Sequence, residues 1–169
     1  MEADGYSIVS LSGRPFAAFP AAVVVPIVNR EEELLLLESQ RRPGCWEPVS
    51  GAVDEGETLL EAAVREVREE AGPALRVRPL GVVHASTFAY DARVRRMISV
   101  VYLMAHEGGT AIPGDDMRGS RVRWATLGVI ESQGLRLLPP LDQSWLRLRT
   151  VELFRLWEPE PAALLQGPL

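Results

Sequence analysis

The sequence has one cysteine, no lysine and no long uninterrupted hydrophobic run. A lone cysteine, Cys45, cannot form an internal disulfide, which excludes a disulfide-stapled secreted scaffold. The longest apolar run, Phe19–Val28, is about half the ~20 residues that a membrane-spanning helix needs. The first residues of the chain are acidic and lack the basic stretch of a signal peptide. We therefore expect a cytoplasmic protein that does not bind a membrane.

The charge balance is acidic, because 18 arginines face 23 aspartates and glutamates and the net charge is −5. Non-specific binding of nucleic acid needs a basic face, so nucleic acid is not expected as a partner. With 47% hydrophobic and 24% charged residues, the composition is that of an ordinary globular protein. A length of 169 residues favours one domain. We predict this domain over residues 1–157, with a core at about 20–130 and a flexible Pro-rich tail at 158–169.

The hydrophobic pattern predicts alternating strands and helices. Helical periodicity is expected over Thr58–Ala71, ended by Gly72 and Pro73, and again over Gln143–Leu156. Gly108–Gly119 is expected as a polar connection. The predicted strands or extended segments are Ala21–Val28, Leu34–Leu37 (its hairpin partner), Cys45–Val49, Arg76–Val83, Ile98–Met104 and Arg121–Trp124. Strands around an early helix, closed by a late one, indicate a mixed α/β (α+β) sandwich.

Three glutamates near the end of the first predicted helix violate a local stability rule. At 100° per residue, Glu66, Glu69 and Glu70 fall within an arc of about 100°, beside the apolar stripe. Like charges at these spacings cost a few tenths of a kcal/mol each, and the helix dipole adds roughly 0.3–1 kcal/mol. A divalent metal would reverse this penalty, because carboxylates are ligands of Mg²⁺. From the helix alone, a solvated acidic face balanced by Arg65 and Arg68 is an equally good interpretation.

The spacing of the charged and glycine residues decides between these interpretations. Gly51, five residues, Glu57, seven residues and then the run Arg65–Gly72 resemble the Nudix box at every charged and glycine position. The departure is Pro73, where the family usually has an aliphatic residue. That position only packs the exit of the helix, so we do not expect it to affect catalysis.

The resemblance implies a Nudix-type α/β/α sandwich with a mixed sheet and a pyrophosphohydrolase activity. In this family the box binds Mg²⁺ or Mn²⁺, and water attacks phosphorus in a nucleoside diphosphate linked to another group. Carried over by position, Glu66, Glu69 and Glu70 would be metal ligands, and the Ser50 carbonyl would add a further oxygen.

The resemblance also implies roles in catalysis. One glutamate would act as general base on the attacking water, and we favour Glu69 with Glu66 as the alternative. Arg65 would orient the glutamates, and Glu57 would brace the loop against the start of the helix. Gly51 and Gly72 complete the motif.

Many members of the family supply one more acid from a loop before a late strand that carries a tryptophan. Here Trp124 marks that strand, and Asp115 and Asp116 lie in the preceding loop. A solvated turn beside Pro113 and Gly114 is at least as good an interpretation of the two aspartates.

Four residues are weaker candidates for substrate binding. Trp46 could stack on a base, although packing beneath the box is favoured. Tyr90 lies at about the distance from the box where dinucleoside polyphosphate hydrolases of this family carry a tyrosine. Arg93 and Arg95 share one face of a predicted hairpin and could contact a polyphosphate, although a solvated edge is favoured.

The substrate expected from the local sequence is a small-molecule nucleotide, a (deoxy)nucleoside triphosphate or a related pterin triphosphate. Dinucleoside polyphosphates and nucleotide sugars stay open, as does a non-catalytic domain that senses a nucleotide. Residues 1–20 and the helix from Gln143 could pack on their own core or form the contact of a homodimer.

Overall fold

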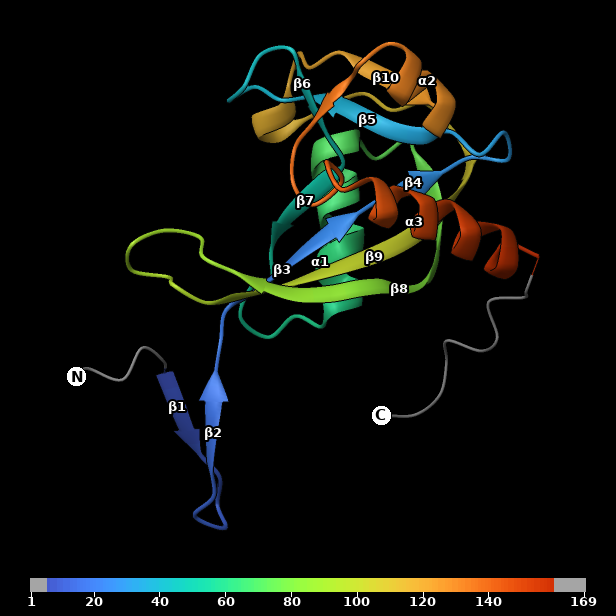
Figure 1. Ribbon diagram of the computed structural model, residues 1–169. Helices are drawn as coiled ribbons and strands as arrows, with labels where there is room; N and C mark the ends of the chain where they lie inside the picture. Colours follow the sequence, from blue (N-terminus) through green and yellow to red (C-terminus); the bar gives the residue numbers. More distant parts are fainter. Residues whose placement is uncertain (1–5, 160–169) are drawn as a thin grey trace.

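The computed structural model describes residues 6–159, so the predicted tail lies outside the described residues from position 160 onward (Figure 1). Within the described part, no helix is long and apolar enough to cross a membrane. The strands are β1 (Tyr6–Val9), β2 (Pro15–Ala18), β3 (Ala21–Val25), β4 (Ile27–Val28), β5 (Leu34–Glu38), β6 (Cys45–Glu47), β7 (Val49–Ala52), β8 (Arg76–Phe88), β9 (Met97–Gly108), β10 (Val122–Ala125) and β11 (Arg136–Leu137). The helices are α1 (Leu59–Glu66), η1 (Val67–Ala71), η2 (Asp115–Met117), α2 (Leu127–Ser132) and α3 (Ser144–Trp157).

A mixed sheet of nine strands is the centre of the fold. β9 pairs in parallel with β3 and β4 on one side and antiparallel with β8 on the other. β7 pairs with β3. β5 pairs with β4, β6 and β10, and β11 pairs with β6. The expected α+β architecture with a mixed sheet is confirmed. β1 and β2 form a separate two-stranded sheet.

Hydrophobic cores lie on both faces of the main sheet. Alternate residues of β3 point to opposite faces: Val23 and Val25 belong to the cluster under α1, and Val24 to the cluster under α2 and α3. Figure 1 shows α1 and α3 on opposite faces of the sheet. Burial on both faces explains why this segment is a continuous apolar run rather than an alternating one.

The predicted single strand over 21–28 is divided by Pro26. A proline has no N–H to donate to a ladder, although its carbonyl still accepts from the Met104 N–H at 3.0 Å. β3 and β4 therefore pair with different antiparallel partners, and the expected hairpin with residues 34–37 is reduced to the pair Val28 and Leu34. This division frees β3 to pair with β7, the strand that carries Ser50 and Gly51.

The predicted helix over 58–71 begins as expected and changes geometry before its end. Thr58 and Glu61 form a reciprocal capping box, with the Glu61 N–H donating to Thr58 Oγ1 and the Thr58 N–H donating to Glu61 Oε2. The helix is α-helical to Glu66 and then forms the π-helical turn η1. An angle of 100° per residue therefore does not hold beyond Glu66. Wide turns of this kind are frequent at functional sites.

The end of η1 is fixed by the segment that precedes η2. The Ile112 N–H donates to the Ala71 carbonyl at 2.8 Å, and the Gly114 N–H donates to the Glu70 carbonyl at 3.2 Å. Gly72 ends the helix with a φ of 95°, and a Cβ atom there would lie 2.4 Å from the Ile112 carbonyl oxygen. The predicted polar connection 108–119 is thus packed against the end of the helix formed by α1 and η1, and it includes the short helix η2.

Other element boundaries differ from the predictions in informative ways. β8 extends to Phe88 rather than Val83, and the strand expected at 121–124 is found one residue later. The C-terminal helix is found at Ser144–Trp157, and its Leu146, Val151 and Phe154 are buried in the main core. The sequence analysis missed the hairpin β1–β2 and the short helix α2, which is capped by Thr126.

Replacing Gly72 by alanine should destabilise the fold by about 2 kcal/mol or more. An L-residue is strained at this φ, and the new Cβ would collide with backbone that cannot move independently. Urea unfolding would measure the change. Gly56→Ala is the matched control, because Gly56 has a φ of 85° and open space around its Cβ position. Equal losses in the two variants would contradict the role given to the contact with Ile112.

The ion pair between Glu38 and Arg121 should make stability depend on pH in the acid range. Two hydrogen bonds from Arg121, at 2.6 and 2.7 Å, and one from the Gly44 N–H lower the pKa of Glu38 from 4.5 to about 2. Because the pKa is lower in the folded state, the stabilisation is complete above about pH 4.5 and disappears as the pH falls toward 2.

Glu38→Gln tests this dependence. The melting temperature of the variant should lie below that of the wild-type protein at pH 6, and the difference should shrink steadily between pH 4.5 and 2.5. Glu131→Gln, which changes an exposed glutamate of α2, serves as the control and should follow the wild-type curve. A difference that does not vary with pH would show that the Glu38 charge is not the cause.

Candidate active site

The guanidinium of Arg65 connects four segments of the box. Its Nε and Nη2 donate to the two carboxylate oxygens of Glu57 at 2.8 and 3.0 Å. Nη1 donates to Glu66 at 2.7 Å and to Glu69 at 3.0 Å, and Nη2 also donates to the Ala52 carbonyl at 2.8 Å. One side chain of α1 thus holds the end of β7, the following loop and both turns of the helix together.

This network shifts the pKa values of Glu57 and Arg65. Hydrogen bonds from Arg65 hold the pKa of Glu57 below its ordinary value, with a further contribution from the Asp54 N–H. The pKa of Arg65 is raised, mainly by Glu57 and then by Glu66 and Glu69, so the guanidinium stays charged at every accessible pH. Charge-assisted, two-pronged pairs of this kind orient a carboxylate as well as attract it.

Glu66 lies directly against the backbone of β7. A Cβ atom on Gly51 would lie 1.8 Å from Glu66 Oε1 and 2.0 Å from its carboxyl carbon, so only glycine leaves space for this carboxylate. Glu66 is buried apart from a small exposed fraction. The glycine at the first position of the motif is therefore required by the position of a glutamate fifteen residues later.

Glu70 is the second buried carboxylate, and it faces the same strand. The Ser50 N–H donates to Glu70 Oε2 at 2.9 Å. Since Ser50 and Gly51 are adjacent on β7, the strand contacts both Glu66 and Glu70. The side chain of Glu70 thus meets the residue whose carbonyl the sequence analysis selected as a further oxygen ligand.

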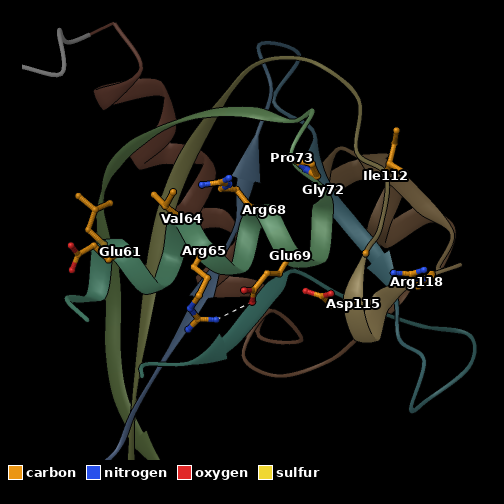
Figure 2. Close-up of a pocket in the computed structure, with 12 residues that line it drawn as sticks. Glu61, Val64, Arg65, Arg68, Glu69, Gly72, Pro73, Ile112, Asp115 and Arg118 are labelled. Carbon is orange, nitrogen blue, oxygen red and sulfur yellow. Dashed lines mark hydrogen bonds and ion pairs between the residues drawn. The ribbon is translucent and has the colours of Figure 1, made fainter. Parts of the chain in front are cut away.

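Glu69 differs from the other two glutamates because it lines an open cleft. Its side chain is 42% exposed and its carboxylate accepts from Arg65. The cleft has a volume of about 640 Å³ and runs along α1 to η2. Figure 2 shows Glu69 between Arg65 and Asp115 at its centre. The lining residues are Leu60, Glu61, Val64, Arg65, Arg68, Glu69, Gly72, Pro73, Ile112, Gly114, Asp115 and Arg118.

The three glutamates fit a divalent cation in the chemistry of their donors. The carboxylates of Glu66 and Glu70 are buried, and that of Glu69 is half-exposed. A bound divalent cation would offset this concentration of negative charge. Arg65 supplies the cationic partner of Glu66 and Glu69 in this arrangement. Among the side chains that the structure describes, no three acidic, histidine or cysteine groups surround a common point closely enough to hold a metal ion.

Asp115 and Asp116 lie in η2, close to the motif helix. Asp115 has a φ of 43°, which is uncommon for an aspartate, and it lines the cleft. In Figure 2 its carboxylate points toward Glu69. The geometry therefore brings Asp115, from a loop more than forty residues away, next to the predicted site.

The four weaker candidates for substrate binding lie elsewhere. Trp46 is 7% exposed and packs in the core cluster under α2 and α3, so the expectation that it packs beneath the box was wrong. The guanidinium of Arg121 lies 5.5 Å from its ring centroid. Tyr90, Arg93 and Arg95 are exposed in the loop 89–96 between β8 and β9, which Figure 1 shows projecting from the sheet. The assumption that strand alternation places Arg93 and Arg95 on one face was wrong, because neither lies in a strand.

The sequence analysis missed most residues of the cleft. Arg68 was considered only as a charge that balances the acidic face, and Ile112, Gly114 and Arg118 come from the segment between β9 and β10. Periodicity carries no information on how such a connection packs. The one available signal was the concentration of glycine and proline in this connection. It predicts a turn, but not the element against which the turn packs.

Comparisons with known proteins agree with this geometry. The NUDIX domain family matches residues 18–147. An ADP-ribose pyrophosphatase of Methanocaldococcus jannaschii is 35% identical over 102 residues, which are 59% of each chain. A dihydroneopterin triphosphate diphosphatase of Escherichia coli is 40% identical over 52 residues, which are 30% of this chain and 35% of that protein. The chain thus spans about three fifths and one third of these two relatives.

The fold is also found among solved structures. A hydrolase of the NUDIX family from Clostridium perfringens superimposes with a TM-score of 0.62 and 17% identity, over 80% of this chain and 96% of that one. At this identity the likeness concerns the fold. Together with the family match over most of the sequence, it leads to one conclusion: the chain belongs to the Nudix family.

Proposed function

We propose that the protein hydrolyses a pyrophosphate bond in a nucleoside diphosphate derivative by attack of water at phosphorus, with Mg²⁺ or Mn²⁺ as cofactor. The observation that carries this proposal is the joining of Glu57, Glu66 and Glu69 by Arg65 beside an open cleft. A purely structural ion-pair network would not need to place one of its carboxylates in a cleft of this size.

The cofactor would be held by Glu66, Glu69 and Glu70, with the Ser50 carbonyl as a further oxygen. When bound, a divalent cation neutralises phosphate charge and makes a water molecule more acidic. The protein's part is to hold the ligands in place. The Ser50 N–H does this for Glu70, and Arg65 does it for Glu66 and Glu69.

Glu69 is our choice for the general base, with Glu66 as the alternative. A base must reach the attacking water, and Glu69 is the glutamate of the three that lines the cleft. Glu66 lies against Gly51 in a buried position. Arg65 orients the Glu69 carboxylate from the side opposite Asp115, which we propose as an additional acid near the substrate (Figure 2). Asp116 stays a prediction.

The substrate that we propose is a (deoxy)nucleoside triphosphate or a similar triphosphate, cleaved to a monophosphate and pyrophosphate. The similarity to a dihydroneopterin triphosphate diphosphatase over 52 residues supports this choice. The longer similarity to an ADP-ribose pyrophosphatase favours a second candidate, a nucleoside diphosphate sugar. A cleft of about 640 Å³ is large enough for either compound.

A non-catalytic sensing domain is the alternative from another functional class. Such a domain would have no need to retain the acidic residues of the box. Here every glutamate of the motif is present, and three of them share the Arg65 network. We therefore favour the enzyme.

A substrate panel tests the proposed activity. The purified protein would be assayed for release of phosphate and pyrophosphate with Mg²⁺, with Mn²⁺ and with a chelator. The panel contains (d)NTPs, nucleoside diphosphates, dinucleoside polyphosphates, ADP-ribose and nucleotide sugars. We expect cleavage of one class that the chelator abolishes. Silence over the whole panel, while nucleotide still binds, would favour the sensing domain instead.

Replacing Glu70 by glutamine tests the assignment of the metal ligands. The neutral amide can still accept from the Ser50 N–H but is a poor ligand for Mg²⁺, so kcat/KM should fall by at least about 100-fold. Folding should be unchanged or slightly improved, because a negative charge near the C-terminal end of the helix is removed. Glu55→Gln, in the exposed loop before α1, is the control and should keep full activity. Unaltered turnover in Glu70→Gln would refute the assignment.

A further inference from the structure

The hairpin β1–β2, residues 6–18, stands apart from the rest of the molecule. Its two strands pair only with each other among the described residues, and Figure 1 shows them projecting from the end of the sheet where β3 begins. The hairpin exposes large apolar side chains: Ile8 is 64% exposed, and Val9, Leu11 and Phe16 are also exposed. We call residues 6–18 the arm.

The arm has hydrogen bonds of its own, but in the described chain its strands have no further strand to pair with. Its turn is closed by hydrogen bonds between Ser10 and Arg14, and the Arg14 guanidinium lies 5.0 Å from the Phe16 ring centroid. An isolated two-stranded hairpin is marginally stable at best in water, and needs a third strand or a packing surface. β1 and β2 have only four residues each and expose apolar side chains, so the arm needs a further strand or surface to pack on.

The main sheet has a strand edge that could supply this partner, but only over part of its length. β8 pairs with β9 and, within residues 6–159, with no strand on its other side. Its first part is protected, because the register shifts at Arg76, at Pro79 and at Val82, and Arg149 of α3 donates to the Val83 carbonyl. Bulges, prolines and covering side chains are the usual means of blocking an edge strand.

The last part of β8, Ala85–Phe88, has none of these protections. All four residues are exposed, and they pair with β9 in unbroken register. An exposed, regular edge is a template for one more strand. Its length of four residues equals that of β1 and of β2.

The arm cannot reach this edge in its own molecule. Ala21 and Thr87 pair with the same residue of β9, Ile98, so the arm leaves the sheet at the level of the free edge. A strand added outside β8 would lie three strand spacings from β3, about 14 Å. Phe19 and Pro20 are the whole linker between Ala18 and Ala21, and this linker spans at most about 11 Å.

We propose that the arm of one copy adds to the Ala85–Phe88 edge of a second copy, and that the exchange is reciprocal in a two-fold symmetric dimer. Each chain carries both an arm that needs a sheet and an edge that accepts a strand, so one symmetric contact satisfies both.

The mass of the full chain in solution tests the proposal. Sedimentation should give a dimer for the wild-type protein and a monomer for Ile8→Asp, because burial of a charge against the partner sheet is unfavourable. The arm lies outside both cores, so the variant should keep its folded body, as checked by its melting temperature. Leu156→Asp is the matched control: Leu156 is 63% exposed on α3, and this variant should stay dimeric.

Hydrogen exchange identifies the docking site. In the wild-type dimer the Ala85–Phe88 amides that point away from β9 should exchange slowly. In Ile8→Asp their exchange should rise by at least about tenfold, while that of β3 stays unchanged. A monomeric wild-type protein would overturn the proposal. So would a dimer whose Ala85–Phe88 amides exchange equally fast with and without the Ile8 substitution.

Discussion

The guanidinium of Arg65 is the interaction on which the candidate site depends. It is bound by Glu57, by the Ala52 carbonyl, and by Glu66 and Glu69 of its own helix. A planar group with five donors can hold several oxygens in fixed directions at once, which a lysine ammonium cannot do with the same geometry. The network therefore explains how like-charged residues stay together at the end of a helix where the dipole opposes them.

The sheet contributes to the same site through close approach. β7 can lie against the helix because Gly51 has no side chain, and the neighbouring Ser50 N–H receives the Glu70 carboxylate. β7 is in place because Pro26 divides the preceding apolar run, so that β3 pairs with β7 and β4 with β5. A residue that interrupts one ladder thus decides which strand faces the motif helix.

The cleft and the free strand edge are formed by different elements of the described chain. The cleft is lined by residues of α1, η1 and the segment around η2, whereas the arm consists of β1 and β2 and the Ala85–Phe88 edge belongs to β8. The cleft adjoins a departure from regular structure, the π-helical turn η1, whereas the free edge is the part of β8 whose pairing with β9 is regular. An exposed, regular strand edge leaves backbone groups that can pair with one more strand.

The sequence by itself determined the family, the motif helix with its capping residues and the three glutamates, because fixed spacings and helical periodicity are local properties. It also indicated the mixed architecture. Tertiary structure alone decided that Asp115 faces Glu69, that Trp46 is buried, and that Arg93 and Arg95 lie in a loop. These facts depend on how connections pack and where a strand ends, and both are set by contacts between residues far apart in the chain. For the same reason the separate arm could not be recognised from a hydrophobic pattern, which is similar for covered and uncovered strands.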